Sequence, residues 1–297
     1  MRCRILLSLL ITVLIFVIIF IRIDITSFAS YMLAINPFIL SISMLFIVFT
    51  ITLNGIRWKY LIRQKYNIGI MKSIKLTLLG FSFNIITPSR LGDFTKAHYL
   101  KKENLLDLKS GNSSIIFEKG MDLFALSILA LIGIFAMGLT GYFFLILIPV
   151  LLMVAFFNIR YLKRISFIMR KERIRKVIVS FCDFFDNIRK DRRLFLSAMG
   201  ITFLLWFLCI FQVYLFFLCF DLSPSILSVF ALVPIAILIG MIPVTFAGMG
   251  TRDSAMILLF PGIPAPLVLG VGFLMTLRYI ISAIAGLPAT RDYINKL

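Results

Sequence analysis

The chain has 297 residues, of which 61% are hydrophobic and only 15% charged. A soluble domain of this length would need a polar surface that such a composition does not supply, so the sequence predicts an α-helical membrane protein. The formal net charge of +18 does not predict nucleic-acid binding, because excess Lys and Arg in a membrane protein mark cytoplasmic loops and attract anionic lipid headgroups.

The first apolar run, residues 5–21, follows a basic start and resembles a signal peptide. It is longer than the apolar region of about 7–15 residues in such peptides, so we interpret it as an uncleaved first span. Five later segments are also long and apolar enough to be spans. The predicted full spans are 5–21, 38–56, 113–137, 142–157, 194–220 and 263–286.

Two further apolar regions contain helix-breaking residues. Residues 76–87 are a short apolar stretch that ends at a proline, and residues 226–260 are interrupted by Pro234, Pro243 and a pair of glycines. We expect both regions to be re-entrant or broken helices. The predicted fold class is therefore all-α: a polytopic helical membrane protein with about six full transmembrane helices plus two broken elements, in one transmembrane domain (1–297) without a fused soluble catalytic domain.

The distribution of charge predicts the orientation. With the N-terminus in the cytoplasm, most of the 31 Lys and Arg residues lie inside, in 1–4, 57–75, 88–112, 158–193 and 287–297. Eight full crossings would instead place the strongly basic 158–193 outside, against the positive-inside rule. We therefore expect a multi-pass protein of the inner or plasma membrane. The two broken elements would enter from opposite faces, as in transporters built from inverted repeats.

Residues 158–193 combine many basic residues with interspersed apolar ones. This pattern is typical of a basic amphipathic helix on the anionic inner leaflet, and a solvated cytoplasmic linker is the alternative.

Four charged residues lie inside predicted spans, where an unpaired charge costs several kcal/mol. Glu118 and Asp122 are four residues apart and share a helix face, with Lys119 beside them. Arg278 lies in an apolar stretch, and its candidate partners are Glu118, Asp122 and Asp253. This charge network could be structural or functional, and the sequence favours neither.

The two broken elements resemble each other. The segments 88–97 and 243–255 both contain proline, glycine, a neighbouring Arg and Asp, and a later alanine. Glycine lets the backbone approach a ligand, and free backbone N–H groups beside an arginine favour phosphate or carboxylate. The alternative is that these residues only hold loops in place. The predicted lipid-headgroup-binding residues are Arg90, Gly92, Asp93, Gly248, Gly250, Arg252 and Asp253.

These residues resemble a known family, the flippase-like membrane proteins related to the transmembrane region of lysylphosphatidylglycerol synthase. The resemblance covers nearly the whole chain. Asp93 and Asp253 stand where the family usually has Glu, and Lys96 and Lys119 stand where it usually has Arg. The sign of each charge is kept, but the length and hydrogen-bonding geometry of the side chain change. The motifs that carry the resemblance are Arg57-Trp58, Pro88-x-Arg90-x-Gly92-Asp93-x-x-Lys96, Glu118-Lys119-x-x-Asp122, Pro243 through Asp253, and Arg278 with Gly286.

The resemblance implies a protein that binds an anionic or phosphate-bearing lipid, either a phospholipid or a polyprenyl-phosphate-linked one, and moves its headgroup between leaflets. This role is that of a transporter rather than an enzyme, and we expect no cofactor, no metal site and no nucleic-acid partner, since the single His98 has no partner ligands and the cysteines show no CxxC spacing. Two alternatives stay open: a membrane component of lipid-linked glycosyl or aminoacyl transfer, and a scaffold for a cytoplasmic enzyme. A homo-oligomer or a partner synthase is also compatible with the sequence.

Overall fold

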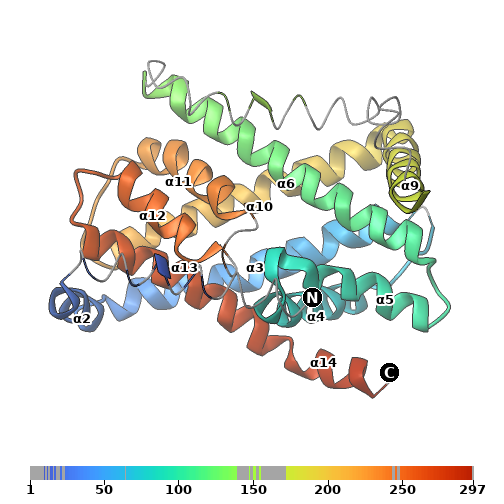
Figure 1. The fold of residues 1–297 in the computed structure, drawn as a ribbon, viewed down its shortest axis with the longest axis horizontal. Helices are drawn as coiled ribbons and strands as arrows, with labels where there is room; N and C mark the ends of the chain where they lie inside the picture. Colours follow the sequence, from blue (N-terminus) through green and yellow to red (C-terminus); the bar gives the residue numbers. More distant parts are fainter. Residues whose placement is uncertain are drawn as a thin grey trace.

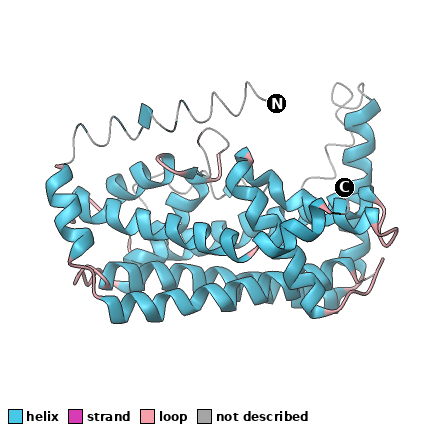
Figure 2. Cartoon of the chain, turned by 90° about the horizontal axis from the view of Figure 1, so that it is seen from below, coloured by secondary structure: helices cyan, strands magenta, loops and turns pink. Residues whose placement is uncertain are grey.

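The computed structural model describes residues 24–63, 65–138, 172–242, 245 and 248–295, together with isolated positions between 10 and 21 and between 147 and 154. The described residues fold into helices joined by short loops (Figures 1 and 2). In chain order the helices are α2 (Ile25–Leu33), α3 (Pro37–Ile62), α4 (Ile70–Ile86), the 3₁₀ helix η1 (Pro88–Asp93), α5 (Phe94–Lys102), α6 (Leu108–Ala136), α9 (Glu172–Lys190), α10 (Arg192–Leu218), α11 (Ile226–Gly240), α12 (Thr251–Leu259), α13 (Ala265–Ala285) and α14 (Leu287–Ile294).

Four of the predicted spans are confirmed. Helices α3, α6, α10 and α13 are long and apolar enough to cross a membrane. They match the predicted 38–56, 113–137, 194–220 and 263–286, with some ends shifted by a few residues. Helix α3 continues past the predicted end to Ile62, which brings Arg57 inside a helix that we expected to stop before it. The predicted spans 5–21 and 142–157 lie largely outside the described residues.

Both predicted helix breaks are present. Helix α4 begins at Ile70, earlier than expected, and ends where Thr87 adopts an extended backbone before Pro88. The short η1 and α5 follow it. In the second region α11 continues through Pro234, so the interruption expected at that residue is wrong, and Pro243 lies outside the described residues. Helix α11 ends at Gly240, and α12 starts after Gly250, whose φ of +88° is one that residues other than glycine rarely adopt.

The distribution of polarity is that of a membrane protein, because large apolar side chains face outward while charges are buried. Phe38, Val48 and Phe49 on α3 are 73%, 62% and 60% exposed, whereas Arg57 on the same helix is 1% exposed. A soluble protein would show the opposite arrangement. With its four long apolar helices, the chain is a polytopic helical membrane protein.

The described helices form two halves that run in opposite directions. Each half has a long helix, a shorter one, a break, a nine-residue helix and a second long helix: α3 to α6, and then α10 to α13. Along the contact between α3 and α10, Ser43 lies against Gln212 and Arg57 lies against Thr202. The residue numbers rise on one helix as they fall on the other, so the two helices are antiparallel (Figure 1).

The packing between the halves is reciprocal. Helix α4 of the first half packs on α13 of the second, and α11 of the second half packs on α6 of the first. Two units of opposite direction that exchange equivalent contacts form the inverted arrangement common in transporters.

Helix α9 stands at one end of the molecule, across the direction of the long helices (Figures 1 and 2). It forms most of the described part of the predicted 158–193 segment, whose last residues begin α10. Its apolar face packs against α6 and α10 through Phe181, Phe184, Phe185 and Ile188. In this part of the segment, the apolar face is therefore buried against other helices of the protein. Its contact with the inner leaflet remains a prediction.

Candidate functional site

Arg57 is the centre of a buried ionic cluster between α3, α6 and α10. Its guanidinium group donates to Asp122 at 2.5 Å and to Glu118 at 2.8 Å, and it also contacts Thr202 at 3.3 Å. The indole N–H of Trp206 donates to the same Asp122 at 3.0 Å. Because Glu118 and Asp122 lie on one face of α6, a single arginine can bind both carboxylates.

The cluster continues into the first broken element. Lys96 of α5 contacts the second oxygen of Glu118 at 3.0 Å. Lys119 of α6 forms an ion pair with Asp93 of η1, and the Asn84 amide donates to the same carboxylate at 3.1 Å. The cluster ties α3, α4, η1, α5 and α6 together through charge-assisted contacts.

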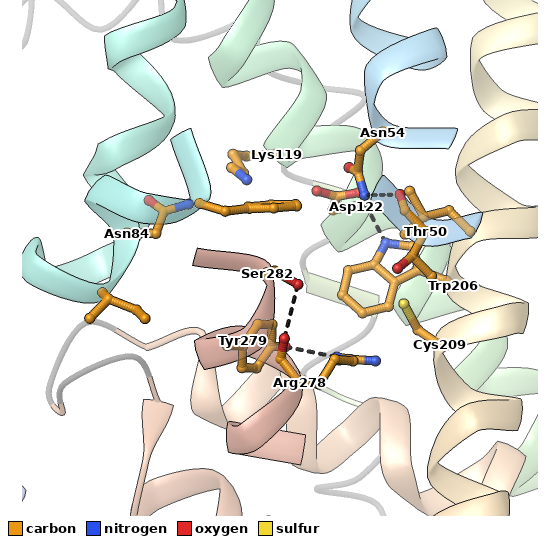
Figure 3. A pocket seen from close by; sticks show the side chains of 13 residues that line it. Thr50, Asn54, Asn84, Lys119, Asp122, Trp206, Cys209, Arg278, Tyr279 and Ser282 are labelled. Atoms are coloured by element: carbon orange, nitrogen blue, oxygen red, sulfur yellow. Dashed lines mark hydrogen bonds between the residues drawn. The ribbon is translucent and has the colours of Figure 1, made fainter. Parts of the chain in front are cut away.

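A cavity of about 90 Å³ lies beside this cluster, at the contact between the two halves (Figure 3). Its walls come from α3, α4, α6, α10 and α13, so both halves contribute to it. Figure 3 shows Lys119 and Asp122 on one side, with Arg278, Tyr279 and Ser282 across from them. Apolar side chains complete the wall: Phe81, Ile85 and Leu205.

Arg278 does not have the partners that the sequence suggested. The ion pairs of the described residues leave Arg278 without a carboxylate, so the expectation of a pair with Glu118, Asp122 or Asp253 is wrong. Its guanidinium group donates instead to Gln212 and to the Tyr279 hydroxyl, both at 3.1 Å, and Gln212 donates to the carbonyl of Ser43. Glu118 and Asp122 already bind Arg57, and Asp253 binds Arg252, which accounts for the difference.

The second broken element forms a separate buried pair. Arg252 donates to Asp253 at 2.6 Å, to the carbonyl of Gly272 at 2.8 Å and to Thr276 at 3.0 Å. The other oxygen of Asp253 accepts from the backbone N–H of Gly250 at 3.0 Å, which caps the start of α12. In this conformation the pair fastens α12 to α13.

The glycines of the broken elements allow close backbone packing. A Cβ atom on Gly92 would lie 2.4 Å from the backbone nitrogen of Asn84. A Cβ atom on Gly248, whose φ is +76°, would lie 2.4 Å from the carbonyl oxygen of Gly240. Each break thus folds back on the helix before it. The side chain of Arg90, another predicted site residue, lies outside the described part of the structure.

The structure therefore brings Asp93, Glu118, Lys119 and Asp122 into one cluster, and Gly250, Arg252 and Asp253 into another. Arg57 and Lys96 are not among the predicted site residues, because both lie in segments whose charges indicate a cytoplasmic location. A signal was available, since both belong to the motifs that carry the family resemblance. Gln212 and Trp206 carried no such signal.

The fold and the site define a class: a helical membrane protein with two antiparallel halves and a charged cavity between them. Over residues 5–288 the chain matches the family described as the lysylphosphatidylglycerol synthase TM region, and it belongs to that family.

Two curated membrane proteins are similar to this chain. A UPF0104 membrane protein of Methanothermobacter thermautotrophicus is 27% identical over 237 residues, which is 69% of this chain and 70% of the relative. A UPF0104 membrane protein of Methanocaldococcus jannaschii is 28% identical over 241 residues, which is 71% of this chain and 70% of the relative. No solved structure matches the chain significantly.

Proposed function

We propose that this protein moves the headgroup of an anionic or phosphate-bearing lipid between the leaflets of the inner or plasma membrane, with its N-terminus in the cytoplasm. The observation that carries the proposal is the cavity between the two antiparallel halves, whose largely apolar wall carries Lys119 and Asp122 on one side and Arg278 on the other.

The cavity has the chemistry that a headgroup path requires. Charged groups in the interior of a membrane protein are costly, and they commonly mark the routes of polar substrates. Here the polar wall adjoins apolar side chains of Phe81, Ile85 and Leu205. A lipid would place its headgroup against the charges and leave its acyl or isoprenoid chains in the apolar surroundings.

The inverted halves supply a means of alternating access. In transporters with this architecture, one repeat rocks against the other around a site at their interface. The broken elements η1 and α12 would guide the headgroup at opposite ends of its path, as the family resemblance implies for Arg90, Gly92, Asp93, Gly248, Gly250, Arg252 and Asp253. Because Arg252 is bonded to Asp253 and α13 here, its contact with a lipid would require α12 to move.

The test is lipid movement in liposomes that contain the purified protein and a fluorescent phosphatidylglycerol, with a membrane-impermeant quencher outside. We expect faster loss of inner-leaflet fluorescence than in protein-free liposomes. Ser282→Phe should return the rate to the protein-free value, because it fills the cavity and keeps every charge. Ser41→Phe is the matched control, since Ser41 is exposed on α3 among lipid-facing side chains, and it should keep the wild-type rate.

Two other results would contradict the proposal. Transfer of a sugar or aminoacyl group from an activated donor to a lipid, by protein in detergent, would favour the transferase alternative. Co-purification of a cytoplasmic enzyme that binds the 158–193 segment, with no lipid movement by either protein, would favour the scaffold.

A further inference from the structure

Among the side chains that the structure describes, the charges in and beside the cavity do not sum to zero. Four of these groups are cations and three are carboxylates, and each carboxylate contacts a cation of α3, α5 or α6. The cations are Arg57, Lys96, Lys119 and Arg278, and the carboxylates are Asp93, Glu118 and Asp122.

The excess positive charge is on Arg278. Arg278 is 5% exposed, and its hydrogen-bond partners are side chains of Gln212, Tyr279 and Cys209, none of which is a carboxylate. A guanidinium group in a low-dielectric interior is stabilised far more by an anion than by neutral acceptors. An anion that entered the cavity would therefore be attracted to Arg278.

In the first half of the molecule, the contact that corresponds to the one between Gln212 and Arg278 joins a cation to carboxylates. Arg57 and Gln212 each lie twenty residues after the first residue of α3 and α10. Arg57 binds carboxylates of α6, whereas Gln212 presents an amide to the arginine of α13. The chain supplies both charges in the first half and only the cation in the second.

The cavity fits one singly charged oxyanion. Its volume of about 90 Å³ exceeds the ~10–15 Å³ that one water requires, which leaves room for a tetrahedral group with a few waters. Lys119 adds a second cation to the wall, and Asn84 adds an amide whose buried oxygen has no hydrogen-bond partner among the described residues. That oxygen would accept from a hydroxyl or ammonium donor. Asp122, also in the wall, disfavours a second negative charge.

We propose that Arg278 anchors a monoanionic phosphodiester in this cavity, the chemistry of a phospholipid headgroup, with Lys119 beside it and the Asn84 oxygen accepting from a headgroup hydroxyl. This assignment rests on the proposed function and names its binding site. It places the anion on α13 rather than on the arginines of the two broken elements.

The experiment measures binding in detergent by the fluorescence of Trp206, which lines the cavity, with the other of the two tryptophans replaced by Trp58→Phe. The probes are short-chain phosphatidylglycerol, dimethyl phosphate and inorganic phosphate. We expect the lipid to bind, dimethyl phosphate to compete with it, and inorganic phosphate, largely a dianion at neutral pH, to compete less. Binding of inorganic phosphate, seen as a change in Trp206 fluorescence, without any binding of the lipid or of dimethyl phosphate would overturn the phosphodiester assignment.

Four variants test the anchor. Arg278→Gln should weaken phosphatidylglycerol binding at least about tenfold, as expected for the loss of charge-assisted hydrogen bonds. Gln212→Glu should do the same, because it supplies an internal carboxylate, and it keeps the size of the side chain. Arg278→Lys should retain part of the binding, and Arg291→Gln, at an exposed position of α14, should retain all of it. Unchanged affinity in a folded Arg278→Gln protein would overturn the proposal.

The two proposals fail separately. Binding that depends on Arg278, without lipid movement in liposomes, would leave the site in place and contradict the transport function. Wild-type lipid movement by Arg278→Gln would contradict the site and leave the transport function in place.

Discussion

Gln212 of α10 accepts a hydrogen bond of 3.1 Å from Arg278 of α13, while in the other half Arg57 of α3 binds Asp122 of α6 at 2.5 Å. The two contacts join equivalent helices of the two halves. The positive charge of Arg57 is neutralised by a carboxylate, whereas that of Arg278 is not. This asymmetry within a repeated architecture separates a structural ion cluster from a candidate anion site, and it suggests which substitutions should affect stability and which should affect function.

Arg57 is expected to be essential for stability. Arg57→Ala leaves Glu118 and Asp122 buried with less positive charge beside them, and removing one partner of a buried pair costs about 3–5 kcal/mol. We expect a clear drop in the thermal unfolding temperature in detergent. Lys75→Ala, which breaks an exposed ion pair with Asp292, is the control and should cost about 1 kcal/mol or less. Equal losses in the two variants would contradict the central role of Arg57.

The glycines at the breaks are expected to tolerate no side chain. Gly92→Ala and Gly248→Ala would each place a methyl group 2.4 Å from backbone atoms of the preceding helix, and Gly248 also has a positive φ. Each should lower the unfolding temperature and the rate of lipid movement. Gly200→Ala in α10 has no atom within 4 Å of the added carbon and should be neutral or stabilising. If Gly248→Ala behaved like Gly200→Ala, the close packing at the second break would be wrong.

The predicted orientation can be tested by labelling single cysteines in cells. Gly69, before α4, and Gly262, before α13, both have open space around the added carbon, so a cysteine at either should not disturb the fold. We expect Gly69→Cys to be protected from an impermeant thiol reagent and Gly262→Cys to react with it. Reaction at position 69 in intact cells would show that the N-terminal half has the opposite orientation.

Asp107 at the start of α6 is expected to make a small contribution to the stability of the fold, and this contribution should depend on pH. Burial is the largest single influence on Asp107 and raises its pKa, but hydrogen bonds from the backbone N–H of Ser110, at 2.9 Å, and from the Ser110 side chain, together with nearby positive charge, lower the pKa below its ordinary value. A carboxyl group with a lowered pKa stabilises the fold above its unfolded pKa of ~3.9, and the stabilisation is lost as the pH falls through that range.

The measurement for Asp107 compares thermal unfolding of the wild type and Asp107→Ala at neutral pH and near pH 3. The loss of an N-cap of this kind costs about 1 kcal/mol. The difference between the two proteins should be present at neutral pH and shrink at acid pH. A difference that is constant across this range would mean that Asp107 does not act through its charge.

The described part of the fold was predictable to a considerable extent. The spans containing α3, α6, α10 and α13 follow from apolar runs of sufficient length, and the breaks at Thr87-Pro88 and at Gly248 and Gly250 follow from residues that cannot continue a helix. The antiparallel halves were expected from charge, because the broken elements were predicted to enter from opposite faces. Helix α3 was predicted to end too early, because Arg57 was counted as a loop charge although it lies in the helix.

The sequence by itself determined the class of protein, the positions of these helices and the residues that interrupt them, since each of these depends on local composition. Only the tertiary structure decided which charges neutralise one another. Arg57 and Asp122 are 65 residues apart in the chain, and Arg278 and Gln212 are 66 apart, so their pairing depends on how helices cross. Because every carboxylate near the cavity is bound elsewhere, the packing leaves Arg278 with neutral partners. A list of charged residues in the sequence does not contain that information.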